Sequence, residues 1–212
     1  MILLLLGPPG AGKGTQGELL AQKLGVPKIA TGDVLRAALR DGTPLGKEAK
    51  SYMDRGDLVP DDVILGIMRE KFEGDDTKKG AILDGVVRTV PQAHGLGVML
   101  AEIGRKLDKV LLFDIDDEKL VARLSSRTVC EKCQHPYTGR QPGSKCDKCG
   151  GTLVRRKDDE PEAVRNRLRV YKDQTEPVIK WYDERKAAPL KIDADGSLEE
   201  VLERALHALK EE

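Results

Sequence analysis

The chain has 212 residues, which is enough for one medium-sized domain with small insertions and a substantial hydrophobic core. Lysine plus arginine and aspartate plus glutamate both number 36, so no net charge favours a nucleic acid or a membrane surface as partner. No apolar run approaches the length of a membrane span, and the apolar N-terminal run lacks the basic flank of a signal peptide. We therefore expect a cytoplasmic protein that binds neither nucleic acid nor membranes.

The first predicted strand, residues 2–6, leads into a glycine-rich loop and then into a helical pattern over residues 16–24. Gly7 and Gly12-Lys13 fit the pattern G-x-x-x-x-G-K, and the hydroxyl group that usually follows comes one place later, at Thr15. In such a loop backbone N–H groups surround phosphate oxygens and the lysine adds a positive charge. The strand–loop–helix context favours a phosphate-binding loop over the alternative, a glycine-rich turn without a ligand.

Strand and helix patterns alternate along the rest of the chain. Short apolar runs predict strands over residues 27–30, 81–84, 109–115 and 190–192. Helical spacing predicts helices over residues 34–40, 44–53, 61–72, 91–103, 117–126, 162–184 and 197–209, with residues 31–33 capping the first of them. This alternation predicts an α/β fold with a parallel five-stranded sheet flanked by helices and ligands at the carboxyl ends of the strands.

Two segments do not fit this sheet. Residues 31–59 form a helical excursion between strands, and the polar segment that follows residue 126 is rich in Gly, Cys and Lys without a helical period. We expect two small flaps, residues 31–59 and 127–159, inserted in a core made of residues 1–30, 60–126 and 160–212.

Four cysteines in the second flap form two C-x-x-C pairs: Cys130, Cys133, Cys146 and Cys149. Four thiolates at this spacing suit a tetrahedral, structural Zn²⁺ ion, and so polar a segment needs such a stabilising centre. His135 lies close by, but a complete set of four thiolates does not require it. Disulfides or reduced, unliganded cysteines remain alternatives. Another alternative is a zinc ribbon that binds RNA. The lack of interleaved aromatic residues and the zero net charge argue against it.

Five motifs in order along the chain now point to a family. They are G-P-P-G-A-G-K-G-T-Q at residues 7–16, T-G-D-V-L-R at 31–36, L-D-G at 83–85, R-T-V-P-Q at 88–92 and R-K-D-D at 156–159. Together they resemble adenylate kinases of the bacterial form with a long zinc-binding lid, over essentially the whole chain. The resemblance implies the Mg²⁺-dependent reaction ATP + AMP ⇌ 2 ADP, which balances adenine nucleotides, a P-loop core, an AMP-binding flap, an ATP lid and a monomer.

The resemblance also assigns roles to individual residues. It places ATP on Gly10, Ala11, Gly12, Lys13, Gly14, Thr15, Arg123, Arg127, Pro136, Tyr137 and Gly196. It places AMP on Thr31, Arg36, Asp57, Leu58, Val59, Gly85, Val86, Val87, Arg88, Gln92, Arg156 and Arg167. The implied catalytic set is Lys13, Arg88, Arg123, Arg156, Arg167, Asp158 and Asp159, the last two fixing the closed lid. Asp33 and Asp84 would hold Mg²⁺ through water. Guanidinium groups match phosphate oxygens, so the residue chemistry agrees.

The sequence departs from the family pattern at Val86-Val87, where Phe-Pro is usual, and in a shorter loop between the cysteine pairs. We expect trans peptide bonds from Gly85 to Arg88 and weaker AMP binding with the ATP site unaffected. Two further alternatives stay open. One is a kinase of another nucleoside monophosphate on the same fold, and the other is a slowly hydrolysing nucleotide switch, which would lack the second nucleotide site that Arg36 and Arg88 indicate.

Overall fold

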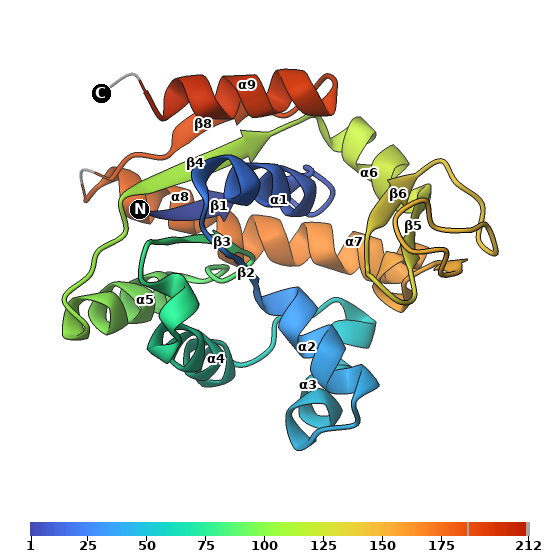
Figure 1. Ribbon diagram of the computed structural model, residues 1–212, viewed down its shortest axis with the longest axis horizontal. Helices are drawn as coiled ribbons and strands as arrows, with labels where there is room; N and C mark the ends of the chain where they lie inside the picture. The colour runs from blue at the N-terminus through green and yellow to red at the C-terminus, as the bar shows by residue number, and fades with distance from the viewer. Residues whose placement is uncertain (186, 211–212) are drawn as a thin grey trace.

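The computed structural model describes residues 1–185 and 187–210 and is built on a five-stranded parallel sheet (Figure 1). In spatial order the strands are β2 (Lys28–Ala30), β3 (Ala81–Asp84), β1 (Ile2–Leu6), β4 (Lys109–Asp114) and β8 (Leu190–Asp193). This confirms the predicted α/β fold with its parallel sheet. Residues 186, 211 and 212 of the expected core segment 160–212 lie outside the described residues.

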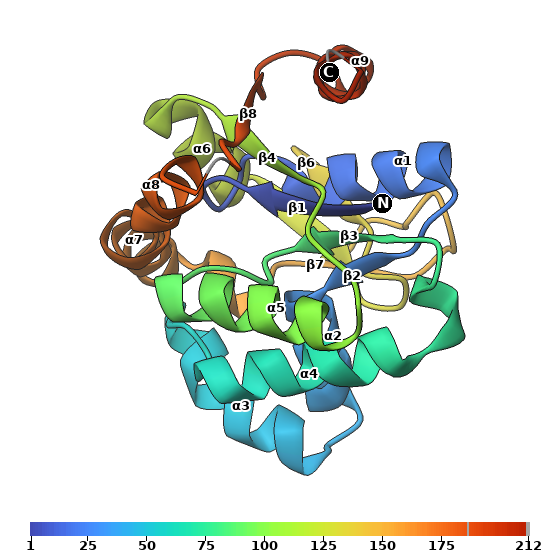
Figure 2. The same cartoon turned by 90° about the vertical axis from the view of Figure 1, so that its left-hand side faces the viewer.

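Helices cover both faces of the sheet (Figure 2). Leu3 and Leu5 of β1 pack on one side and Leu4 and Leu6 on the other, because successive side chains of a strand point to opposite faces. The first side carries α1 (Lys13–Leu24), α6 (Asp117–Ser125) and α9 (Leu198–Ala208). The second side carries α4 (Asp61–Glu73), α5 (Val90–Glu102) and α8 (Glu176–Asp183). Burial on both faces explains the continuous apolar run of β1.

The predicted cap of the first flap helix is wrong. Helix α2 (Thr31–Arg40) begins at Thr31, with Ala30 at the N-cap position, so residues 31–33 form its first turn. The Thr31 hydroxyl does not cap the helix because it donates to Gly85 O at 2.7 Å, across to the loop after β3. A tertiary hydrogen bond has therefore replaced the local capping bond that the sequence suggested.

The predicted helix over residues 162–184 is one helical run with a change of pitch in the middle. It consists of α7 (Pro161–Val170), the π-helical segment η3 (Tyr171–Thr175) and α8. Pro177 stands in the first turn of α8 and has no N–H group to bond the preceding turn, which accounts for the interruption. Within the π segment Thr175 donates to Arg88 O at 2.8 Å, so the irregular turn holds a loop of the candidate site.

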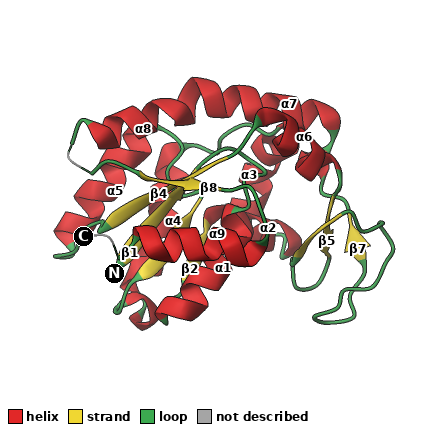
Figure 3. Cartoon of the chain, turned by 90° about the horizontal axis from the view of Figure 1, so that it is seen from above, coloured by secondary structure: helices red, strands yellow, loops and turns green. Residues whose placement is uncertain are grey.

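The two segments that do not fit the sheet fold separately from it (Figures 1 and 3). The first contains α2 and α3 (Pro44–Arg55), which pack against each other. The second forms an antiparallel sheet of β6 (Pro136–Thr138), β5 (Arg127–Cys130) and β7 (Leu153–Val154), followed by the short helix η2 (Lys157–Asp159). A further short helix, η1 (Asp75–Thr77), follows α4. We call residues 31–59 the flap and residues 127–159 the lid.

None of the helices in the described part of the chain combines the length and the apolar content that crossing a membrane requires.

Candidate active site

A cavity of about 520 Å³ lies between the loop after β1, the flap and the lid. A volume of this order suits organic ligands of nucleotide size. The expected site residues that line it are Gly10, Ala11, Gly12, Lys13, Gly14, Thr15, Thr31, Asp33, Arg36, Asp57, Leu58, Val59, Asp84, Gly85, Val87, Arg88, Gln92, Arg123, Arg127, Pro136, Arg156, Asp158, Arg167 and Gly196. Most of the residues that the motifs singled out are thus brought together at the carboxyl ends of the strands.

The glycine-rich loop after β1 has a backbone that only glycine permits at its first position. Gly7 has φ 136°, and a Cβ atom there would stand 2.3 Å from Phe113 O. Lys13 folds back over the loop, donating to Gly7 O at 2.7 Å and to Pro8 O at 2.8 Å. Burial lowers the pKa of Lys13 to about 8, against the raising effect of Asp84. A bound phosphate would favour the charged form, so the loop is suited to an anion.

Six arginines line the same cavity: Arg36, Arg88, Arg123, Arg127, Arg156 and Arg167. Burial lowers the pKa of Arg88, Arg156 and Arg167, and nearby guanidinium groups lower it further, to about 10 for Arg156. The Nε atoms of Arg36 and Arg156 are buried without a hydrogen-bond partner. Buried, mutually repelling cations with unused donors are unfavourable by themselves, so they indicate a ligand with several negative charges.

Two carboxylates of the lid, Asp158 and Asp159, fix the positions of Arg127 and Arg167. The Asp159 side chain is fully buried, and its oxygens accept from Arg127 Nε at 2.7 Å and from Arg167 Nη1 at 3.0 Å. Asp158 accepts from Arg167 at 3.2 Å. Burial would raise the pKa of Asp158, but the surrounding arginines, Arg167 first, hold it below its usual value. Asp159 does not line the cavity; it positions two arginines that do.

The two expected magnesium ligands differ in their surroundings. Asp33 is paired with Arg36 at 2.5 Å and with Lys28 at 3.7 Å, and although burial opposes it, these cations lower the pKa of Asp33. Asp84 ends β3 beside the glycine-rich loop, where a Cβ atom on Gly14 would lie 3.4 Å from its Oδ2. Carboxylate oxygens are the ligands that Mg²⁺ prefers. Both carboxylates have cationic neighbours, since Asp84 faces Lys13 and Arg88. Asp84 fits a water-mediated magnesium site better because it lies against the glycine-rich loop.

The loop that carries Arg88 is fixed from two further elements. Arg88 N donates to Gln92 Oε1 at 2.7 Å, and Arg88 Nε donates to Gly85 O at 3.2 Å. The peptide bonds from Gly85 to Arg88 are trans, as expected. Thr31 and Gln92, which we expected at the AMP site, both line the cavity and both bond to this loop. Their role in the described geometry is to shape the wall of the cavity.

Two other expected contacts point away from the cavity. Val86 and Val87 are both buried in the hydrophobic core, and of the two only Val87 also lines the cavity. The Tyr137 hydroxyl lies 3.3 Å from Cys146 Sγ and accepts from Asp147 N at 3.0 Å. Alternation along β6 explains this, because Pro136 and Thr138 face the cavity and the residue between them faces the cysteines.

Some lining residues were missed by the motif analysis. Lys28 donates to Gly14 O at 3.2 Å and thereby joins β2 to the start of α1. Gln134 and Thr138 line the lid side, and residues 197 and 198 extend the wall beyond Gly196. Two-residue alternation from Pro136 could have found Thr138, whereas Gln134 lies in the turn before β6 with φ 59° and follows no strand pattern. No local sequence pattern distinguishes Lys28 from the other lysines of the chain, because its contact with the cavity depends on its hydrogen bond to the start of α1.

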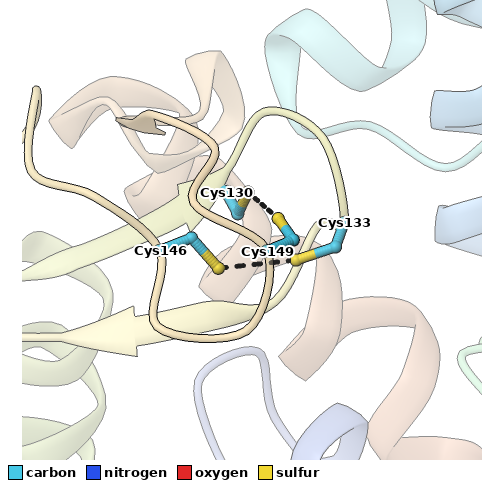
Figure 4. Close-up of side chains that lie close together, drawn as sticks. All are labelled: Cys130, Cys133, Cys146 and Cys149. Carbon is cyan, nitrogen blue, oxygen red and sulfur yellow. Dashed lines mark hydrogen bonds between the residues drawn. The ribbon is translucent and has the colours of Figure 1, made fainter.

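The four cysteines of the lid form one cluster, with all four Sγ atoms within 4.8 Å of one another (Figure 4). Cys130 and Cys149 are 3.4 Å apart and Cys133 and Cys146 are 3.6 Å apart, and all four are free thiols, which excludes the disulfide alternative. Four sulfurs at about 2.3 Å from one ion would be separated by similar distances. His135 packs edge-on against Tyr137 at 4.9 Å and is not part of the cluster.

Comparison with known proteins gives a consistent result. The family model described as "Adenylate kinase" matches residues 5–187. The chain is 65% identical over 212 residues to an adenylate kinase of Gemmatimonas aurantiaca, covering 99% of each chain. It is 50% identical to an adenylate kinase of Acidothermus cellulolyticus, covering 99% of this chain and 98% of the relative. An adenylate kinase of Methanosarcina barkeri is 46% identical, with 99% of each chain covered.

Proposed function

The chain belongs to the adenylate kinase family, and we propose that its central cavity holds ATP and AMP end to end for direct transfer of the γ-phosphoryl group. The chain is a phosphotransferase of the nucleoside monophosphate kinase type, and the reaction is ATP + AMP ⇌ 2 ADP. The observation that carries the proposed geometry is the group of buried arginines with unpaired Nε atoms between the glycine-rich loop and the flap.

ATP would occupy the end of the cavity formed by the glycine-rich loop, α6 and the lid. Backbone N–H groups of residues 10–15 and the Lys13 ammonium group face its β- and γ-phosphates. Arg123 donates to Ala194 O at 3.2 Å and so lies beside the Gly196 loop, where the adenine would pack. Pro136 and Thr138 close this end from the lid. Arg127, held by Asp159, contacts the phosphates.

AMP would occupy the flap end. Arg36 and Arg88 face its phosphate, and residues 57–59 with Gly85 and Val87 form the wall around the base. The proposed AMP site leaves out a direct contact from Val86, because that side chain lies in the core. Thr31 and Gln92 support the wall through the loop that they bind.

Transfer needs little covalent help from the protein. An oxygen of the AMP phosphate attacks the γ-phosphorus in line, the bond from this phosphorus to the bridging oxygen breaks, and the electron pair leaves with ADP. Lys13, Arg88, Arg156 and Arg167 surround the place where negative charge builds up, and they are preorganised in a site of low exposure. Asp158 and Asp159 keep Arg167 in position.

Two metal ions fit the donor sets of the chain. Mg²⁺ would neutralise part of the phosphate charge, and Asp84 is the carboxylate best placed to hold it through water. The four lid thiols suit Zn²⁺, whose role would be structural because the cluster is complete without a substrate ligand. Free thiols that serve as metal ligands are typical of the reducing cytoplasm, which supports a cytoplasmic location. The monomeric state stays a prediction.

One coupled assay tests the proposal. ADP formation from ATP is measured with AMP, GMP, CMP or UMP as acceptor. We expect rapid turnover with AMP and much slower turnover with the other three. Equal or greater activity with another monophosphate would show that AMP is not the preferred acceptor. ATP hydrolysis without dependence on any monophosphate would contradict the two-nucleotide cavity.

A further inference from the structure

Helix α7 holds the end of the flap through one side chain that the reaction mechanism does not use. Asn166 Nδ2 donates to Arg55 O at 2.8 Å and to Asp57 Oδ1 at 2.7 Å. Its Oδ1 accepts from Arg169 Nη2 at 2.7 Å. These three partners fix the orientation of the amide. A flip of the amide would place its oxygen against the two acceptors and its NH₂ group against the Arg169 donor. Both hydrogens of the NH₂ group are used.

The contact lies where the flap returns to the core. Helix α3 ends at Arg55, and Gly56 follows with φ 77°. A Cβ atom on Gly56 would stand 2.6 Å from Arg167 Cγ and 2.8 Å from Ala163 O, so the flap backbone lies directly against α7. Asp57, the next residue, accepts from Arg55 Nε at 2.7 Å on its other oxygen. The hydrogen bonds from Arg55 and Asn166 lower the pKa of Asp57.

The residues on either side of this contact belong to the cavity. Residues 57–59 line its AMP end, and Arg167, the residue after Asn166, lines its centre. The bonds of Asn166 therefore join the wall around the acceptor nucleotide to the helix that carries an arginine of the transfer site. A helix and a loop joined by close backbone contact and two hydrogen bonds keep a defined spacing, which in-line transfer requires.

We propose that Asn166 is a positioning residue for the acceptor nucleotide, which sets the backbone of residues 56–59 at a fixed distance from Arg167. This inference rests on the proposed function, because it takes residues 57–59 as the wall of the AMP site. Asn166 touches no substrate in this arrangement, and it acts through Asp57 and the carbonyl of Arg55. Its effect is confined to one of the two nucleotides, since the glycine-rich loop and the lid make no contact with it in the hydrogen bonds described.

The test compares the KM values for AMP and ATP in three variants. Asn166→Ala removes both donated bonds, and we expect a rise in the KM for AMP of about three- to tenfold with the KM for ATP unchanged. Asn166→Asp should raise the KM for AMP further, because a carboxylate would face the Asp57 carboxylate. Asn166→Asp combined with Asp57→Asn should recover most of the loss, since the amide of residue 57 can then donate to residue 166 while its oxygen accepts from Arg55.

A matched control is Lys50→Ala, which removes an exposed ion pair with Asp54 on the same flap helix but away from α7. It should leave both KM values unchanged. The proposal is overturned if Asn166→Asp leaves the KM for AMP unchanged, or if both KM values and the unfolding temperature change together, as a merely structural role predicts. The proposal is also contradicted if the double variant Asn166→Asp, Asp57→Asn does not recover the KM for AMP.

The wild-type protein separates this inference from the proposed function. If it forms no ADP from ATP and AMP, the proposed function fails, and AMP binding to the same variants is then measured by calorimetry. Weaker AMP binding in Asn166→Asp with recovery in the double variant still supports the positioning role. Unchanged AMP binding, or no AMP binding in the wild type, overturns it.

Discussion

The flap and the lid both contribute walls to the cavity, but different forces stabilise them. The flap has an apolar cluster formed with the start of α4 by Leu35, Ala49, Val59, Ile64 and Ile67, all buried. The corresponding cluster of the lid contains only Cys130, Cys146 and Leu153, with Tyr137 packed against it. Burial of apolar surface can hold the flap, whereas the small apolar cluster of the lid leaves it to depend on the proposed metal at its four thiols.

The two segments also meet the core differently. The flap docks on α7 through Gly56 and through the neutral amide of Asn166, which donates to a backbone carbonyl and to the Asp57 carboxylate. The lid is held mainly by charge, because Asp159 accepts from Arg127 at its beginning and from Arg167 of α7. Because we propose that Arg127 and Arg167 bind nucleotide phosphates, their ion pairs with Asp159 should be sensitive to the bound nucleotide. We therefore expect the lid position to respond to ATP and the flap position to respond to AMP.

The largest expected effect comes from a residue that belongs to neither segment. Lys13→Met should lower kcat by about 10²–10³-fold, since we propose that this buried ammonium group faces the transferring phosphates. Both segments should keep their stability, because Lys13 bonds only to carbonyls of its own loop in the described contacts. Steady-state kinetics and the unfolding temperature check this. An unchanged kcat in the folded variant would remove the glycine-rich loop from the mechanism.

The second prediction separates the lid from the flap. Cys130→Ser should lower the unfolding temperature by roughly 5–10 °C, since each lost kcal/mol shifts it by about 2–4 °C in a chain of this size. Activity at low temperature should fall less. The measurements are calorimetry and zinc content, and hydrogen exchange should increase in the lid and not in the flap. Equal stability after complete metal removal would contradict a structural metal.

The third prediction destabilises the flap and leaves the lid unchanged. Leu35 is 4% exposed in the flap cluster, so Leu35→Ala should destabilise the flap by roughly 2–4 kcal/mol. Hydrogen exchange should increase over residues 31–59, and the KM for AMP should rise while the zinc content stays constant. A matched control is Val154→Ala, a change at a 37% exposed residue of the lid. Loss of zinc from the Leu35 variant would show that the two segments are not independent.

The sequence predicted the sheet, the helices and the place of the cavity because these depend on local patterns. The apolar run of β1 and the glycines after it place the phosphate loop directly. The C-x-x-C spacing likewise predicts a cluster that a single ion can hold. Each C-x-x-C pair and the glycine-rich loop occupy a few consecutive residues, and both patterns keep their meaning in the folded chain.

The sequence did not predict contacts that depend on distant elements. Thr31 looked like a helix cap but bonds to Gly85 O, and Val86 looked like a nucleotide contact but lies in the core. The expected gain in AMP affinity from Phe-Pro at residues 86 and 87 therefore needs revision. A phenylalanine at the buried Val86 would overpack the core, at a cost of about 1–3 kcal/mol. Val87 lines the cavity, but it is also buried in the same core cluster.

The smallest expected effect concerns a contact between the lid and the core. Lys148 of the lid lies 3.8 Å from Glu18 of α1, and Glu18 also lies 3.5 Å from Lys28. The Lys148 and Glu18 side chains are 54% and 39% exposed, so solvent and salt screen their attraction. Such a pair contributes about 0.2–1 kcal/mol, and Glu18 keeps a second partner when Lys148 is removed.

Lys148→Ala should therefore raise the KM for ATP by less than about fivefold at low salt, with no change in the KM for AMP. The difference from the wild type should disappear in high salt, because the Debye length falls to about 3 Å at 1 M. Lys132→Ala removes the same charge from another exposed position of the lid and is the control. A loss of ATP affinity that persists in high salt would show that Lys148 acts through packing or through direct contact with the nucleotide. An equal effect of Lys132→Ala would assign the change to the total charge of the lid and remove any special role of the contact with Glu18.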